Sequence, residues 1–261
     1  MIDYALEEAG TDATLAVITL NSPGKLNALN EQALRDLDAA YARAEADGVR
    51  ALLLRGEGRA FCAGRDISEV DPRSDDVRGY LDGLLTPLLR RMAEFPAPTF
   101  AAAQGASLGV GLGLLIATDV VYVSADAKIG SPFAALGATL DSGGHALFFD
   151  RLGTHRTLDL IYSGQLMSGE EAVRSGLFSR ALPPEDLQAV AHGAATTAAS
   201  GPTRAFLESK RLVARLRDPR VGFWEALERE NRAQAELCDT DDYREGFAAF
   251  QAKRKPTFRG R

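Results

Sequence analysis

Short hydrophobic runs alternate with amphipathic stretches along the first half of the chain. Residues 14–20 (TLAVITL) and 49–54 (VRALLL) are rich in branched aliphatic side chains, as buried strands are. Between them, residues 31–48 place apolar side chains at helical spacing, with Asn30 before them as a helix N-cap and Gly48 at the end. This pattern predicts a strand, a helix and a second strand.

The alternation continues further along the chain. Residues 98–103 predict a strand, residues 112–119 (LGLLIATD) a helix of small side chains, and residues 120–125 another strand. From residue 154 onward, one helical pattern follows another. We therefore predict an α/β fold, with an α/β core over residues 1–200 and a helical C-terminal region over residues 201–261.

Composition and charge exclude several classes of protein. The net charge of -6 and the pI of about 5.2 argue against binding to nucleic acids or membrane surfaces. Cys62 and Cys238 form neither a disulfide scaffold nor a metal-binding cluster, so no metal site is expected. The N-terminus lacks an export signal, and the most apolar segment, residues 100–117, is too short to span a membrane. These features predict a cytoplasmic protein.

A glycine-rich segment precedes the second predicted helix. Residues 105–113 (GASLGVGLG) place free backbone amides at a helix start, where they can stabilise an oxyanion or bind phosphate. Close helix packing is the alternative reason for these glycines. The glycine spacing does not match the fingerprint of dinucleotide-binding proteins.

The same segment contains the pattern G-x-S-x-G, with Ser107 in the place of a hydrolase nucleophile. A serine hydrolase would also need an acid and a base in the order Ser, Asp, His. The candidates for these two roles are Asp119, Asp141, His145, His155 and His192. No HGGG-like oxyanion loop precedes Ser107, and the histidines have no special local setting, so the hydrolase is a minor alternative.

Two further segments have the character of functional loops. Residues 61–67 (FCAGRDI) contain small residues where a ligand could approach the backbone, although an ordinary strand-to-helix loop also explains them. Residues 137–144 (GATLDSGG) hold Asp141 among glycines and apolar side chains, as a general base with a raised pKa requires. Capping of the helix that follows is the alternative role of Asp141.

The chain ends in a basic segment, residues 253–261 (KRKPTFRGR), whose five basic side chains have no acidic neighbour among them. Such a run is either a solvated tail or a contact for the phosphates of an anionic ligand.

Four motifs together resemble the crotonase superfamily of enoyl-CoA hydratases and isomerases. They are residues 20–30 (LNSPGKLNALN), 58–67 (GRAFCAGRDI), 102–119 (AAQGASLGVGLGLLIATD) and 168–182 (SGEEAVRSGLFSRAL). The resemblance implies a ββα spiral core with a helical C-terminal region and an acyl-CoA thioester substrate. It also implies no cofactor beyond the CoA of the substrate, and a homotrimer or dimer of trimers.

By this resemblance, the backbone N–H groups of Arg65 and Val110 form an oxyanion hole for the thioester oxygen. The two glutamates of family hydratases correspond to Gly113 and Phe133, so hydration should be very slow or absent. Asp141 stands where similar isomerases carry the aspartate of a P-D-x-G-G motif, although Leu140 replaces the proline. The C-terminal residues 241–258 resemble the ring-1,2-epoxyphenylacetyl-CoA isomerases in particular.

The resemblance also assigns the substrate contacts. Phe133 and Leu140 are expected to line the acyl pocket, and Lys253 and Lys255 to meet the phosphates of CoA. The remaining CoA contacts are expected at Lys25, Ala28, Ala63, Asp66 and Ile67.

We therefore expect an acyl-CoA isomerase of fatty acid or phenylacetate metabolism, with Asp141 as its acid and base. Other thioester chemistry of the same family and a non-catalytic acyl-CoA-binding protein remain alternatives. A dehalogenase is disfavoured, because Thr86 occupies the position of its expected histidine.

Overall fold

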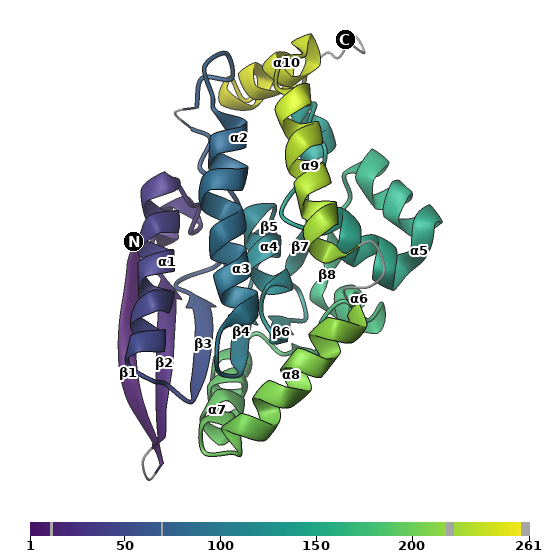
Figure 1. Cartoon of the computed structure of the whole chain (residues 1–261). Helices are drawn as coiled ribbons and strands as arrows, with labels where there is room; N and C mark the ends of the chain where they lie inside the picture. Colours follow the sequence, from purple (N-terminus) through teal and green to yellow (C-terminus); the bar gives the residue numbers. More distant parts are fainter. Residues whose placement is uncertain (11–12, 69, 218–221, 257–261) are drawn as a thin grey trace.

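The computed structural model describes residues 1–10, 13–68, 70–217 and 222–256. Its main sheet runs from the left edge of the view in Figure 1 to the middle of the molecule. Its strands run in the order β1-β2-β3-β4-β6-β9. They are β1 (Ile2–Gly10), β2 (Ala13–Leu20), β3 (Ala51–Gly56), β4 (Thr99–Ala103), β6 (Val120–Ser124) and β9 (Arg180–Leu182). β1 pairs with β2 in the antiparallel sense, and every other neighbouring pair is parallel. The predicted α/β class is confirmed.

The helices cross from strand to strand and then gather in the C-terminal region. They are α1 (Glu31–Ala46), α2 (Val77–Tyr80), α3 (Thr86–Glu94), α4 (Val110–Ile116), α5 (Gly144–Ser163), α6 (Gly169–Arg174), α7 (Leu187–Ala199), α8 (Thr203–Arg217), α9 (Phe223–Leu237) and α10 (Asp241–Gln251). Shorter turns occur at η1 (Pro23–Lys25), η2 (Leu81–Leu85, a π-helix) and η3 (Phe133–Leu136). No helix in the described ranges has the length and apolar character needed to cross a membrane.

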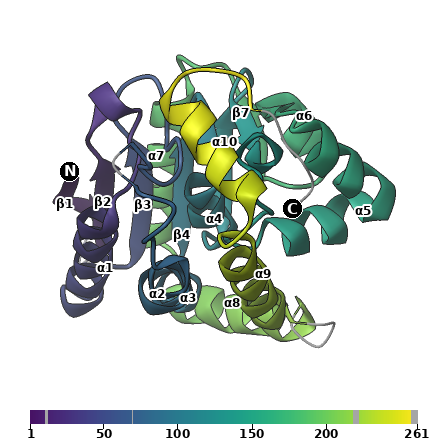
Figure 2. The same ribbon diagram turned by 90° about the horizontal axis from the view of Figure 1, so that it is seen from above.

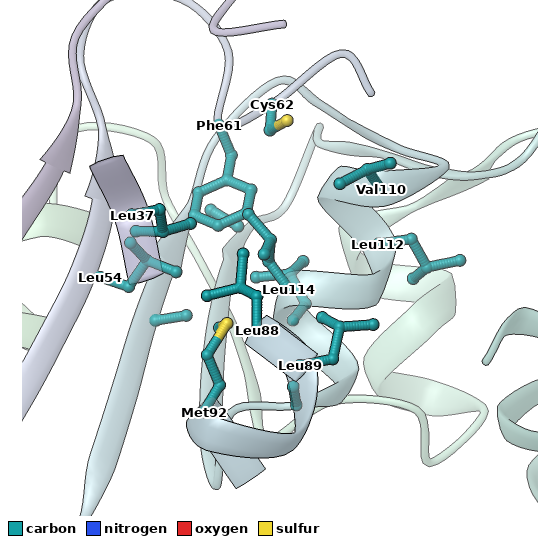
Figure 3. Close-up of a cluster of buried hydrophobic side chains, with 14 of the residues drawn as sticks. Leu37, Leu54, Phe61, Cys62, Leu88, Leu89, Met92, Val110, Leu112 and Leu114 are labelled. Carbon is teal, nitrogen blue, oxygen red and sulfur yellow. The ribbon is translucent and has the colours of Figure 1, made fainter. Parts of the chain in front are cut away.

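Two apolar clusters cover the two faces of the main sheet. On one face, Leu15, Val17 and Leu53 pack against Leu187 and the alanines of α7. On the other face, side chains of the sheet pack against α1, α3 and α4, and Figure 3 shows part of this larger cluster. Burial of such side chains is the main driving force for folding. The loops at the ends of the strands are therefore anchored on a rigid core.

A second, smaller sheet lies beside α4. It contains β5 (Ala106–Leu108), β7 (Lys128–Gly130) and β8 (Met167–Ser168), in the order β5-β7-β8. Because β5 ends only two residues before α4 begins, this sheet fixes the start of that helix.

The C-terminal helices pack back onto the α/β core of the same chain. Phe223 and Leu227 of α9 belong to the larger apolar cluster. In α10, a side chain at Gly246 would overlap the backbone of Leu136, so helix and η3 are in close contact. Figure 1 shows α10 at the upper end of the molecule, with α9 running down from it, and Figure 2 shows α10 from above. The helical C-terminal region is confirmed, whereas the domain boundary at residue 201 stays a prediction.

Candidate active site

Two loops bring the backbone amides of Arg65 and Val110 to one place. The first loop is held by hydrogen bonds from Cys62 N to Ala106 O (2.9 Å) and from Leu108 N to Cys62 O (3.0 Å). A Cβ atom at Gly64 would lie 3.0 Å from the Leu108 carbonyl oxygen and 4.0 Å from the Val110 nitrogen. Gly64 has φ +103, a conformation that favours glycine. The segment before Arg65 therefore packs directly on the turn before Val110.

Both amides are available to a ligand. Val110 is the first residue of α4, and the first amides of a helix have no acceptor within it. Leu29 pairs with Arg65 through the flanking groups Gly64 O and Asp66 N, which leaves the Arg65 N–H outside the ladder. Within the described ranges, neither amide donates to a protein acceptor. Two unpaired amides on adjoining segments are what the predicted oxyanion hole requires, and that role stays a prediction.

Asp141 lies in the loop between η3 and α5 and is 8% exposed. The pKa of its carboxyl is raised from 3.8 to about 7, and burial is the largest cause. The hydrogen bond from Ser142 opposes this rise, as do the charges of Arg65 and His145, whereas the charge of Glu230 adds to it. Ser142 Oγ donates to Asp141 Oδ1 at 2.7 Å. A carboxyl group with this pKa can both accept and return a proton near neutral pH.

The alternative role of Asp141 as a helix cap is wrong. The residue that caps α5 is Gly143, and no side chain of that residue takes part. The Asp141 side chain instead accepts a hydrogen bond from its neighbour Ser142, at a φ of +57 for Ser142.

The Asp141 loop packs against the same helix that presents the Val110 amide. A Cβ atom at Gly113 would lie 2.5 Å from Ser142 Cβ. The charge of the Arg65 side chain, whose amide is the other predicted donor, acts on Asp141 and lowers its pKa. The structure thus brings together Arg65, Val110 and Asp141, three residues that the sequence singled out in three separate motifs.

An aromatic and charged cluster beside Asp141 was not predicted from the sequence. The Arg65 guanidinium makes two hydrogen bonds of 2.7 Å to Asp75 and lies 4.0 Å from the ring centroid of Tyr80. Burial raises the pKa of the Tyr80 hydroxyl, which therefore stays neutral, and the hydroxyl has no partner among the described residues. Tyr243 of α10 is also buried and interacts electrostatically with Asp141. Only the resemblance of residues 241–258 to the ring-1,2-epoxyphenylacetyl-CoA isomerases could have drawn attention to Tyr243 from the sequence.

The residues predicted to bind CoA lie in two adjoining loops. Lys25 Nζ forms an ion pair with Asp66 Oδ2 at 2.7 Å. Burial raises the pKa of Asp66, but the hydrogen bonds from Lys25 and Ser68 outweigh it and lower that pKa below its usual value. The Ala63 amide donates to Leu26 O at 3.0 Å, so the loop that holds Ala28 and the loop that holds Ile67 are tied together.

The basic C-terminal segment reaches the same region of its own chain. Gln251 at the end of α10 donates to Val70 O at 2.9 Å, and Lys253 and Lys255 just beyond it are exposed. Arg254 is bound to Glu245 instead. The other two basic residues of the predicted tail, Arg259 and Arg261, lie outside the described residues.

The two predicted acyl-pocket residues differ in their surroundings. The Phe133 ring covers the start of α4, where a Cβ atom at Gly109 would lie 2.9 Å from it. Leu140 is 2% exposed and belongs to the larger apolar cluster. Phe133 is therefore next to the Val110 amide, whereas Leu140 anchors the Asp141 loop in the core.

The structure gives no support to the serine-hydrolase alternative. Ser107 is buried, and its hydroxyl has no hydrogen-bond partner among the described residues. His145 is bound to Glu230 and Thr139, and His192 lies at the surface bound to Glu7. The described residues also contain no group of His, Cys, Asp or Glu side chains suited to holding a metal ion.

Comparison with known proteins decides the family. The family described as enoyl-CoA hydratase/isomerase matches residues 10–261. The chain belongs to this family. A probable enoyl-CoA hydratase of Rhizobium meliloti (strain 1021) is 39% identical over 252 residues, which cover 96% of each chain. The 1,2-epoxyphenylacetyl-CoA isomerase of Escherichia coli (strain K12) is 33% identical over 266 residues, which cover 100% of both chains.

Solved structures of the hydratase/isomerase family share the fold. An enoyl-CoA hydratase from Mycobacterium avium subsp. paratuberculosis K-10 has a TM-score of 0.85 at 27% identity and covers 99% of this chain and 98% of its own. The predicted crotonase-like fold is confirmed.

Within this hydratase/isomerase family, the two positions that resemble the hydratase glutamates are Gly113 and Phe133. At Gly113 the space of a side chain is filled by Ser142, and at position 133 an aromatic ring covers the start of α4. By the resemblance of the motifs, neither of the acids expected for hydration is present at its position, whereas Asp141 is a buried carboxyl on which the charge of Arg65 acts.

Proposed function

We propose that the protein is an acyl-CoA isomerase that moves a double bond, or the unsaturation of a ring, in an unsaturated acyl-CoA. Asp141 removes a carbon-bound proton that the neighbouring thioester makes acidic. The electron pair moves onto the thioester oxygen, which the Arg65 and Val110 amides stabilise as an enolate. Asp141 then returns the proton at another carbon of the conjugated system, so no water is added and no bond to sulfur is broken.

The observation that carries this proposal is a buried carboxyl group in a loop that packs on α4, the helix whose first amide, Val110 N, is free. Burial raises the pKa of this carboxyl to about 7. One carboxyl suffices for a proton transfer from carbon to carbon, because the same group accepts and delivers the proton. Each oxyanion donor contributes about 2.7 to 4 kcal/mol in enzymes where such donors have been removed.

Hydration is the second candidate, because several similar relatives are named probable enoyl-CoA hydratases. Hydration requires activation of a water molecule and delivery of a proton to carbon, for which family hydratases use two glutamates. The residues at those positions, Gly113 and Phe133, carry no acid. This difference favours isomerisation.

We propose that the CoA moiety lies along the loops of Lys25, Ala63 and Asp66, with its phosphates near Lys253 and Lys255. The hydrogen bond from Gln251 to Val70 O joins the end of α10 to the segment that follows Asp66. The phosphate contacts then come from the same chain as Asp141.

We also propose that the protein assembles as a trimer or a dimer of trimers through α5 and α8. Apolar side chains on these two helices are unusually exposed, with Phe149 61%, Tyr162 75% and Val213 66% accessible. A cavity of about 1100 Å³ lies between the two helices, lined in part by Phe149, Phe206 and Val213. Apolar surface of this extent is typical of contacts between subunits.

The decisive variant is Asp141→Asn, which preserves the shape of the side chain and removes its proton transfer. We expect isomerisation of a 3-enoyl-CoA to fall by a factor of about 10² to 10⁴, the contribution of a positioned acid–base group. The affinity for the CoA ester, measured by calorimetry, should stay within about threefold of wild type, because CoA is held elsewhere. The control is Asp126→Asn, at an exposed turn.

Full turnover by Asp141→Asn would remove Asp141 from the mechanism. Binding without turnover by the wild-type protein, over a panel of linear, cyclic and aromatic unsaturated CoA esters, would instead favour the non-catalytic alternative.

A further inference from the structure

Helix α9 carries three polar residues whose side chains are buried. Glu230, Asn231 and Gln234 are 4%, 1% and 7% exposed. Buried polar side chains are expensive unless they are hydrogen-bonded, so their partners indicate what they hold in place.

The partners of Glu230 and Gln234 lie in the loop that carries Asp141. Glu230 Oε2 accepts from Gly143 N at 2.7 Å, and Glu230 Oε1 accepts from His145 N at 2.9 Å. Gln234 Oε1 accepts from Thr139 N at 3.2 Å. These three acceptors hold the loop over residues 139–145 from both sides of Asp141.

Glu230 supplies what the loop itself lacks. The first amides of α5 have no acceptor within the helix, and its N-cap residue, Gly143, has no side chain to provide one. A carboxylate at this position satisfies two amides and also interacts favourably with the positive end of the helix dipole. His145 Nδ1 lies 2.9 Å from the same oxygen and completes the arrangement.

The charge of Glu230 also acts on Asp141. The groups that interact with Asp141, by a hydrogen bond or through charge, come from several elements: Ser142 in its own loop, His145 of α5, Arg65 after β3, Tyr80 of α2, Tyr243 of α10 and Glu230 of α9. Among those that act on its pKa, burial and Glu230 raise it, whereas the Ser142 hydrogen bond, Arg65 and His145 lower it. Glu230 is thus the carboxylate that opposes ionisation of Asp141.

We propose that Glu230 is a positioning residue of this site: from α9, it fixes the loop that presents Asp141 and keeps a negative charge beside that carboxyl. This inference rests on the proposed function, in which Asp141 transfers the proton. Glu230 itself touches no reacting atom. It acts through the backbone of Gly143 and His145.

The test is Glu230→Gln in the full-length protein, with Glu228→Gln, an exposed residue of the same helix, as the matched control. The titration of the Asp141 carboxyl is followed by carbon-13 NMR and assigned by the signal that Asp141→Asn lacks. In Glu230→Gln the midpoint should move down by about one pH unit, because a like charge has been removed. The kcat for a 3-enoyl-CoA should fall about tenfold or more with KM within about threefold, since the loop loses an anchor but CoA does not. Glu228→Gln should match wild type in both measurements.

An unchanged midpoint together with an unchanged kcat in folded Glu230→Gln would overturn the inference. If Glu230→Gln does not fold, Gln234→Met provides the second test, since it removes an anchor of the loop and no charge. We expect a lower kcat with an unchanged Asp141 midpoint, and a wild-type kcat in folded Gln234→Met would overturn the anchoring role. Full turnover by Asp141→Asn would mean that the proposed function fails, whereas an inactive Asp141→Asn with an unaffected Glu230→Gln would mean that only the role of Glu230 fails.

Discussion

At the scale of single residues, Asp141 is an ionisable group in a buried environment. Its carboxyl is almost fully buried, and its pKa of about 7 lies well above the ordinary 3.8. Because the folded pKa exceeds the unfolded one, the stability associated with the protonated carboxyl is fully present below about pH 4. It is lost as pH rises through 7, where the folded protein must hold a buried charge.

Asp141→Asn should therefore stabilise the fold, and more so at higher pH. The gain in the free energy of unfolding over wild type should grow between about pH 4 and pH 7 and reach up to roughly 4 kcal/mol, at about 1.4 kcal/mol per pKa unit. Urea unfolding at pH 5 and pH 8 measures this gain. A gain that is the same at both values would show that Asp141 ionises normally in the folded protein.

A second prediction concerns Gly113, where a side chain has no room. Gly113→Ala should destabilise the protein by about 1 to 3 kcal/mol, because the new Cβ would lie 2.5 Å from Ser142 Cβ and push on the Asp141 loop. Gly193 of α7 is the matched control, since its Cβ would meet nothing within 4 Å. Gly193→Ala should stabilise by about 0.5 to 1 kcal/mol. Thermal unfolding of both variants checks the opposite signs, and a stable Gly113→Ala would contradict the packing described.

The site residues that could be found from the sequence stand in local motifs, whereas those that could not be found act on residues far away in the sequence. Asp141, Arg65 and Val110 stand in local motifs with glycine neighbours, so each could be noticed alone. Glu230 is separated from Gly143 by 87 positions, and nothing in the helical pattern around it distinguishes it from an exposed glutamate. Its role becomes visible only when α9 has been placed against α5.

At the scale of elements, the strands and helices with a regular apolar pattern were predicted close to their observed bounds. β2, β3, β4 and β6 are buried on both faces and form continuous apolar runs, and α1 begins after Asn30, whose side chain accepts from Ala33 N as predicted. β1 was not predicted. It is an edge strand whose side chains are mostly exposed or half-buried, so it lacks a clear apolar pattern.

The end of α10 gives a prediction at this scale. Replacing both Lys253 and Lys255 with serine should weaken acyl-CoA binding by about tenfold at low salt and reduce its salt dependence, because exposed charges act through screened attraction. In the control, serine replaces Arg35 of α1 and Arg174 of α6, two exposed residues, so that the net charge changes by the same amount as in the test variant. Titrations at two ionic strengths measure the effect. Equal affinity and equal salt dependence in the two double variants would contradict a phosphate contact at the end of α10.

At the scale of the whole molecule, the apolar side chains on α5 and α8 predict assembly. Phe149→Glu combined with Val213→Glu should shift the protein from a trimer or hexamer to a smaller species, because charges would have to be buried in the contact. Light scattering after gel filtration measures the mass. A wild-type monomer, or an unchanged mass of the double variant, would contradict this role of the two helices.

The crotonase-like architecture was predicted from the resemblance of four sequence motifs, whereas the hydrophobic pattern alone predicted only the α/β class. Alternating strands and helices predicted an α/β class, but the second sheet of β5, β7 and β8 consists of strands too short to leave a pattern. The packing of α10 on η3 of its own chain depends on contacts at Gly137 and Gly246 that no periodicity reveals.

We propose that this protein moves protons between carbons and adds no water. The most direct measurement is mass spectrometry, with location of the double bond, on acyl-CoA recovered after incubation of a 3-enoyl-CoA with the enzyme in water labelled with oxygen-18. We expect a shifted double bond without heavy oxygen in the acyl group, and neither change with Asp141→Asn. Rapid incorporation of heavy oxygen, unaffected by Asp141→Asn, would contradict it.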